Sequence, residues 1–243
     1  MQLHLKGGHR VSTGPSWGVF LSGMDSGLRP DGSDAGAEQP ANTEPIPAGE
    51  ALDAGPRQPR ASGPRSLRTQ QTHHDALTGV FNSAGFCARV SEALARPVNN
   101  VGTLALLFVD LDDFTVLNDR LGQTAGDELL RVVAARLSSV VRPGDLVARM
   151  GGDKFAILLD AIPDAGAACL LANRAIVAVV APSDILGQRV VTSASVGVSM
   201  RPANRDLQAF MREADEAMYS AKAHGKRRVE LYDSTLHQAV VAH

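Results

Sequence analysis

Apolar and polar positions alternate in regular blocks from about residue 73 onward, and each block predicts a helix or a strand. Thr103 to Leu111 is a continuous apolar run, the pattern of a central strand with both faces buried. Between Thr124 and Val141 apolar residues recur at helical spacing, which indicates an amphipathic helix. The other predicted helices are 83–95, 114–121, 164–180 and 207–224, and the other predicted strands are 145–150, 155–160, 190–200 and 229–232. This order predicts an α+β fold, an α/β sandwich in which helices flank a mixed central sheet.

The first 72 residues differ in composition from the rest of the chain. Eight of the 13 prolines fall before residue 65, and residues 30–64 contain almost no large apolar side chain. Such a segment buries too little apolar surface to offset the conformational entropy lost on folding, which predicts disorder or a linker. We therefore expect a linker over residues 1–72, one folded domain over 73–233 and a tail over 234–243.

Charge and cysteine content exclude several functional classes. The net charge of −2 gives no overall attraction to nucleic acid or to an anionic membrane. No apolar run approaches the ~20 residues that a membrane-spanning helix needs. Cys87 and Cys169 lie far apart and outside any Cys/His cluster, which argues against disulfides and structural zinc. These features predict a cytoplasmic protein without nucleic-acid or membrane partners, in which a nucleotide ligand would need a local basic site.

Two acidic residues lie at the ends of predicted strands. Asp110 comes at the end of the apolar run, and Asp153 lies in a glycine-containing turn between two strands of a predicted hairpin. If these strands are adjacent, the two carboxylates and the carbonyl of Leu111 offer oxygen ligands to one divalent cation. The alternative is that each carboxylate is simply solvated at a strand end. Lys154 is unusual, because it adds a positive charge where a metal site requires negative charge.

Polar and basic residues elsewhere suggest a nucleotide site. Asn118 and Asp127 flank a glycine-containing turn between two predicted helices, where an amide and a carboxylate can recognise guanine. Asp127 could equally stabilise the N-terminus of the following helix through the helix dipole. Residues 222–228 form a basic cluster that could neutralise a triphosphate, although basic residues are also common at a solvated helix C-terminus.

The order of these motifs resembles that of the GGDEF domains, the diguanylate cyclases of bacterial cyclic di-GMP signalling. The resemblance covers residues 75–232, roughly two thirds of the chain, and implies a fold like that of the nucleotide cyclases and polymerase palm domains. The matching segments are 75–82, 110–114, 118–127, 148–155, 195–198 and 214–222. Several matches in the right order are far more specific than a pair of glycines alone.

The resemblance also implies a reaction and the residues that carry it. Family members condense two GTP molecules, one on each of two facing domains, into cyclic di-GMP with Mg²⁺ or Mn²⁺, so a homodimer or heterodimer is expected. The implied metal ligands are Asp110, the carbonyl of Leu111 and Asp153, and Asp153 is also the implied base for the 3′-hydroxyl. The implied substrate-binding residues are Asn118, Gln123, Asp127, Gly151, Gly152, Lys222 and Lys226, and the implied product-inhibition site is Arg142 with Asp145.

Lys154 is the most consequential departure from the family pattern, which usually has glutamate at this position. Gln123 replaces the usual histidine, Thr115 the usual lysine, and Lys226 the usual arginine. An ammonium group within ~4 Å of a divalent cation is repelled by several kcal/mol at an effective dielectric near ~20. Two hypotheses therefore stay open: a diguanylate cyclase slowed by Lys154, and a non-catalytic receptor for cyclic di-GMP or GTP. A purely structural dimerisation module is disfavoured, because so many ligand positions are kept.

Overall fold

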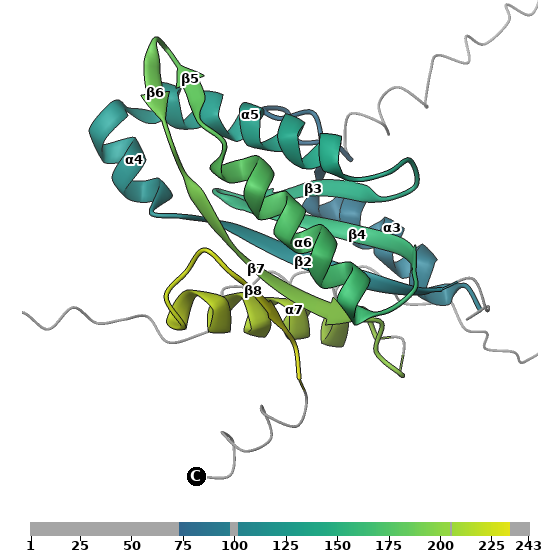
Figure 1. The fold of residues 1–243 in the computed structure, drawn as a ribbon. Coiled ribbons are helices and arrows are strands. Elements are labelled where there is room, and N and C mark those ends of the chain that lie inside the picture. Colours follow the sequence, from purple (N-terminus) through teal and green to yellow (C-terminus); the bar gives the residue numbers. More distant parts are fainter. Residues whose placement is uncertain (1–72, 98–101, 205, 234–243) are drawn as a thin grey trace, which may run out of the picture.

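The computed structural model describes residues 73–97, 102–204 and 206–233 (Figure 1). The predicted linker over residues 1–72 and the predicted tail over 234–243 lie outside the described residues. Within the described part of the chain, no helix combines the length and the apolarity required to cross a lipid bilayer.

A six-stranded mixed sheet forms the centre of the domain, as the sequence predicts. Its strands are β1 (Phe81–Asn82), β2 (Thr103–Asp112), β3 (Leu146–Gly151), β4 (Lys154–Ile162), β7 (Ser193–Met200) and β8 (Val229–Leu231). They lie in the order β1-β3-β4-β2-β7-β8. The outer pairs β1–β3 and β7–β8 are parallel, and the inner strands are antiparallel. The central position of β2 places its C-terminal end between the β3–β4 hairpin and β7.

Helices cover both faces of the sheet (Figure 1). One face packs against α4 (Phe114–Leu121), α5 (Gln123–Val140) and α6 (Ala165–Val180), and the other against α3 (Ser83–Ala95) and α7 (Leu207–Ala223).

The double coverage explains the continuous apolar run of β2, because successive strand residues point to opposite faces. Ala105, Leu107 and Val109 belong to the first core, and Leu106 and Phe108 belong to the second. The predicted α+β sandwich is therefore confirmed.

Helices α3 and α6 begin close to the predicted positions because short polar side chains cap them. The Asn82 side chain accepts a hydrogen bond from the backbone N–H of Gly85 at 2.9 Å, which starts α3. Asp164 accepts from Ala167 N–H at 2.8 Å and starts α6 in the same way. Each cap satisfies a backbone donor that the first helical turn leaves without a partner.

The predicted strand over residues 190–200 is wrong at its N-terminal end. A separate two-stranded hairpin comes first, formed by β5 (Ser183–Ile185) and β6 (Gln188–Val190), and β7 begins only at Ser193. Leu186 and Gly187 form the turn with φ of 52° and 77°. Two left-handed residues are what a tight hairpin turn requires, and apolar alternation cannot distinguish one long strand from a short hairpin followed by a strand.

Candidate functional site

Asp110 and Lys154 lie directly opposite each other on the neighbouring strands β2 and β4. Side chains in such a cross-strand pair point to the same face of the sheet and lie within contact distance. Asp110 is fully buried, and the ammonium group of Lys154 donates a hydrogen bond to its Oδ2 atom. The register of the sheet thus turns the unusual lysine toward the first predicted metal ligand.

A second lysine, from a distant part of the chain, contacts the same carboxylate. Lys222 lies in the last turn of α7, and its Nζ atom is 2.6 Å from Asp110 Oδ1 as an ion pair. Each oxygen of Asp110 therefore faces an ammonium group. Burial alone would lower the pKa of Lys154, but the hydrogen bond and the charge of Asp110 outweigh it and hold that pKa above its ordinary value. Lys154 is consequently charged at neutral pH.

Asp153 occupies the turn of the β3–β4 hairpin, beside this cluster. Burial raises the pKa of the Asp153 carboxyl above its ordinary value, and the negative charge of Asp110 adds to the rise. The charges of Lys154 and Lys222 oppose the shift without cancelling it. The backbone carbonyl of Asp153 accepts a hydrogen bond from Leu111 N–H at 3.3 Å, which ties the turn to the end of β2. A carboxylate with a raised pKa is suited to accept a proton.

The donor set around Asp110 does not fit a divalent cation. Such ions take hard oxygen ligands, commonly from carboxylates. Among the described residues, no cluster of three or more His, Cys, Asp or Glu side chains is placed to hold a metal ion. The ammonium group of Lys154 donates a hydrogen bond to Asp110 Oδ2, and that of Lys222 lies 2.6 Å from Oδ1 as an ion pair, although Oδ1 accepts no hydrogen bond among the described residues. Two positive charges therefore lie at the carboxylate that the family resemblance implies as a metal ligand.

The glycines of the hairpin turn have backbone conformations that other residues rarely adopt. Gly151 and Gly152 have φ of 135° and 55°, and a Cβ added at either would meet no atom within 4 Å. The space above the turn is thus open to a ligand. Arg149 supports the turn from below, because its Nε donates to the carbonyl of Gly152 at 2.9 Å and its guanidinium pairs with Asp75 at 3.3 Å. The Asp75–Arg149 pair is not predictable from local sequence, because the two residues lie far apart in the chain, although both belong to segments that match the family.

The predicted guanine-binding residues meet at the turn between α4 and α5. A Cβ added at Gly126 would lie 1.8 Å from Asn118 Oδ1, so this glycine makes room for the amide. Asn118 Oδ1 is buried and has no hydrogen-bond donor among the described residues. Gln123 and Asp127 are exposed on the first turns of α5. A buried acceptor without a partner is costly, so Asn118 is suited to a ligand that brings an N–H group.

Asp112, the next acidic residue after Asp110 on β2, has a structural role instead. Asp112 is buried and accepts hydrogen bonds from the hydroxyls of Ser193 and Ser195, both at 2.7 Å, and from Arg227 N–H at 3.3 Å. Asp112 thus anchors the chain that follows α7 to the start of β7. The spacing of the two serines, which lie on one face of β7, is the sequence signal that could have revealed this role.

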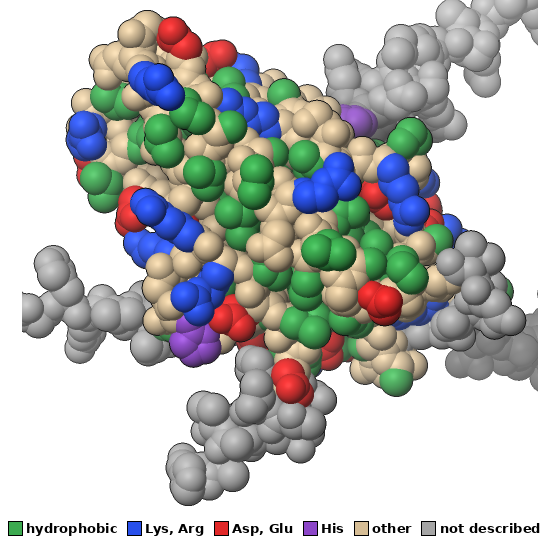
Figure 2. Space-filling view, in the orientation of Figure 1, with side chains coloured by type: hydrophobic (Ala, Val, Ile, Leu, Met, Phe, Trp, Pro, Cys, Tyr) green, Lys and Arg blue, Asp and Glu red, His purple; other side chains and the backbone are tan. Residues whose placement is uncertain are grey.

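Lys226 lies at the same end of the molecule but is already paired. Its Nζ atom is 2.6 Å from Asp113 Oδ1, in the left-handed residue that precedes α4. Figure 2 shows basic side chains on this side of the molecule, over α4 and over the connection between α7 and β8. The Lys226 side chain is 41% exposed and its ammonium group has three donors, so Lys226 can contact a phosphate while it stays paired with Asp113.

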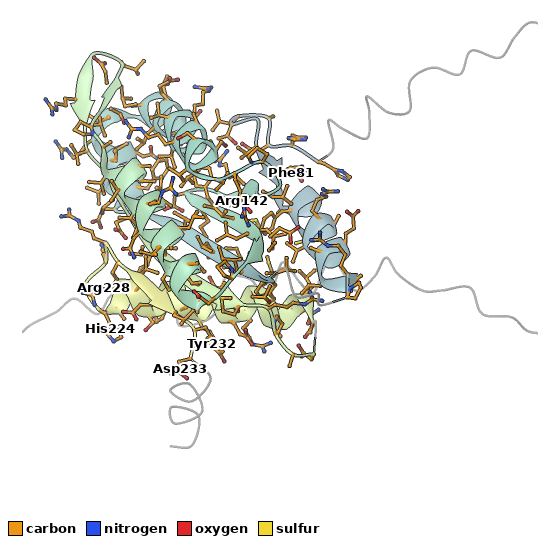
Figure 3. The ribbon with its side chains drawn as sticks, turned by 45° about the vertical axis from the view of Figure 1, so that its right-hand side comes forward. Phe81, Arg142, His224, Arg228, Tyr232 and Asp233 are labelled. Carbon is orange, nitrogen blue, oxygen red and sulfur yellow. The ribbon has the colours of Figure 1, made fainter. Side chains whose placement is uncertain are left out.

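Arg142 and Asp145 are not part of this cluster. Figure 3 shows Arg142 well away from His224 and Arg228. The Asp145 side chain is only 1% exposed and accepts from the backbone N–H groups of Asp160 at 3.1 Å and Arg142 at 3.2 Å. Arg142, which is 54% exposed, donates to the carbonyls of Asp160 and Ala161. Asp145 is thus committed to the fold, and only Arg142 has a surface that an anionic ligand could reach.

Comparison with known proteins identifies the family of this chain. The family described as "Diguanylate cyclase, GGDEF domain" matches residues 72–228. The chain is 40% identical over 186 residues to the diguanylate cyclase TpbB of Pseudomonas aeruginosa, covering 74% of this chain and 43% of TpbB. It is 34% identical over 163 residues to the diguanylate cyclase DgcP of the same species, covering 67% of this chain and 24% of DgcP.

Solved structures agree with these sequence matches. The GGDEF domain of TpbB superposes with a TM-score of 0.66 at 37% identity, covering 70% of this chain and 99% of that domain. A structure of DgcB from Caulobacter crescentus in complex with cyclic di-GMP superposes with a TM-score of 0.63 at 25% identity, covering 68% of this chain and 88% of that one. The chain spans less than half the length of the curated relatives TpbB and DgcP. Since the family match covers well over half of the chain and the fold superposes on a solved GGDEF domain, this protein belongs to the GGDEF domain family.

Proposed function

We propose that this domain is a diguanylate cyclase, which condenses two GTP molecules into cyclic di-GMP and two pyrophosphates, slowly because of Lys154. One observation carries the proposal: Asn118 Oδ1, in the helix that follows β2, is buried without a hydrogen-bond donor among the described residues, and Asp153 and Lys222 lie at the end of β2. This reaction requires an acceptor for a purine N–H group, a carboxylate that can take a proton, and an ammonium group that binds phosphate.

In this reaction Asp153 acts as the base, and lysine side chains offset the negative charge of the phosphates. The 3′-hydroxyl oxygen of one GTP bonds to the α-phosphorus of the other, and the bond from that phosphorus to the pyrophosphate oxygen breaks. The hydroxyl proton passes to Asp153, whose raised pKa makes it a stronger base than an ordinary aspartate. Lys222 and Lys226 offset the charge that develops on the phosphates. No step is assigned to a divalent ion, which the family uses but which the donor set around Asp110 does not fit.

Guanine selection rests on the α4–α5 turn. Asn118 accepts from the base, Asp127 pairs with its N–H groups, and Gln123 adds a hydrogen bond at the rim of the site. Gly151 and Gly152 leave the backbone of the hairpin open to the phosphates. Because each domain holds one nucleotide, two copies of the domain, or this domain and a relative, must face each other for turnover.

The cellular setting follows from the same proposal. We infer a cytoplasmic setting, which fits a chain with only two cysteines, far apart in the sequence. A bacterial second messenger made there would act in signal transduction.

The Gly126→Ala substitution should weaken nucleotide binding about tenfold, equivalent to ~1.4 kcal/mol, without unfolding the domain. The new Cβ would displace the amide of Asn118, the movable end of a side chain, while the helix gains a better helix former. Calorimetric titration with α,β-methylene-GTP, which cannot release pyrophosphate, measures the effect. Thr124→Ala, at an exposed position of the same helix, is the matched control. Equal affinities in the two variants would remove Asn118 from the guanine site.

The proposed reaction is tested by incubating the full chain with GTP and either Mg²⁺ or Mn²⁺, followed by chromatography and mass spectrometry. We expect slow accumulation of cyclic di-GMP and pyrophosphate, with a rate per molecule that rises with protein concentration, because two domains must meet. Asp153→Asn should abolish product, since the amide cannot accept the proton. A complete lack of product after long incubation would contradict the cyclase proposal. Cyclic di-GMP binding that Arg142→Ala weakens would then favour the receptor hypothesis.

A further inference from the structure

Lysine is rare in this chain, yet the described lysines gather at one place. The sequence contains four lysines against 20 arginines. Lys154 and Lys222 both contact Asp110, and Lys226 contacts Asp113, so three lysines from β4 and the C-terminal part of the chain meet the end of β2. A lysine carries a compact point charge on a flexible stem, whereas arginine carries a broad planar one. Compact lysine ammonium groups thus gather at this end of β2.

Two ammonium groups lie at the one fully buried carboxylate at the end of β2. Asp110 pairs with Lys154 and Lys222, and the charges of Asp153 and Asp215 also act on Lys154. Asp110 is fully buried and holds both lysines in place, so their position does not depend on solvent-exposed contacts. A divalent ion that approached Asp110 would be repelled by the ammonium groups of Lys154 and Lys222.

Both lysine side chains also remain partly exposed to solvent. The Lys154 side chain is 27% exposed and that of Lys222 is 32% exposed, while the carboxylate between them is completely covered. An ammonium group has three donors, so a lysine bonded to Asp110 retains donors for a second oxygen. The ammonium groups of Lys154 and Lys222, both held by Asp110, can therefore bind a polyanionic ligand beside the hairpin turn.

We propose that the ammonium group of Lys154 takes the place of the divalent cation, so that this domain binds the triphosphate of GTP without a metal ion. Lys222 completes the cation pair, and the guanine end is held at the α4–α5 turn. This inference rests on the proposed guanine-nucleotide site. It predicts that Mg²⁺, which neutralises free GTP in solution, does not strengthen binding, because it competes with Lys154 for the phosphates.

The test is calorimetric titration of the full chain with α,β-methylene-GTP, in excess EDTA and in excess MgCl₂. We expect the wild-type affinities in the two buffers to agree within about threefold. Lys154→Met, which keeps the length of the side chain and removes its charge, should weaken binding in EDTA by about tenfold or more. Lys154→Arg should retain metal-independent binding, and Arg174→Met, at an exposed position of α6, should leave it unchanged. Thermal unfolding of each variant shows that it is folded.

The possible outcomes separate this inference from the proposed function. Wild-type binding that is lost in EDTA and restored by MgCl₂ overturns the role of Lys154 but leaves the GTP site in place. Binding in EDTA that is equally tight in Lys154→Met also overturns that role. The failure of the nucleotide to bind in either buffer contradicts the proposed function itself.

Discussion

Lys154→Glu should raise the rate of cyclic di-GMP formation in Mg²⁺ at least about tenfold, equivalent to ~1.4 kcal/mol or more in activation free energy. The substitution replaces an ammonium by a carboxylate directly across from Asp110. Removing a positive charge near a divalent ion relieves a repulsion of several kcal/mol at an effective dielectric near ~20, and the new carboxylate adds an oxygen ligand. Product formation in matched assays of wild type and variant measures the effect.

Lys154→Gln is the control for this prediction, because it removes the ammonium without supplying a carboxylate. Its rate should fall between those of the wild type and Lys154→Glu. The variant with glutamate should also unfold at a lower temperature in EDTA than in Mg²⁺, because two carboxylates then face each other at a buried position. If Lys154→Glu and the wild type turn over equally, the residue that limits the rate lies elsewhere in the site.

Gly197→Ala should destabilise the domain by about 3 kcal/mol or more, which would be the largest stability effect of any glycine substitution we consider. A Cβ at this position would lie 2.1 Å from the backbone nitrogen of Met218 and 2.2 Å from the carbonyl oxygen of Ala214. Both atoms belong to the backbone of α7, so no side chain can turn aside and the whole helix must move away from β7. Urea unfolding followed by circular dichroism measures the loss.

Gly166→Ala is the matched control, since its Cβ would meet only Asp164 Oδ1, at 3.2 Å, in the first turn of α6. That variant should stay within ~1 kcal/mol of the wild type. A movement of α7 would also displace Lys222 from Asp110, so nucleotide binding should fall in the surviving folded fraction of Gly197→Ala. A wild-type unfolding curve for Gly197→Ala would mean that α7 does not pack against β7 as closely as the structure shows.

Much of the fold could be predicted from local patterns, and the errors have a physical cause. Strand β2 is buried on both faces and therefore reads as a continuous apolar run, whereas α5 is buried on one face and shows an amphipathic repeat. Both elements appear where expected. The two-residue strand β1 and the β5–β6 hairpin were not predicted, because such short strands carry too little periodicity. Their existence depends on pairing with a neighbour, and pairing is not a property of a single segment.

The candidate site shows the same division. Local patterns in the sequence were enough to find the chemically important residues: the acidic residues at the end of β2, the glycine turn with its lysine, and the basic C-terminal cluster. The pairing of these residues became visible only in the folded domain, where Asp112 anchors Ser193 and Ser195, whereas Asp110 faces Lys154 and Lys222. These pairings depend on strand register and on the docking of α7, which no local pattern encodes. A one-residue shift in the β2–β4 register would turn Lys154 to the other face of the sheet. Asp110 would then keep Lys222 as its partner but lose the ammonium group of Lys154 at Oδ2.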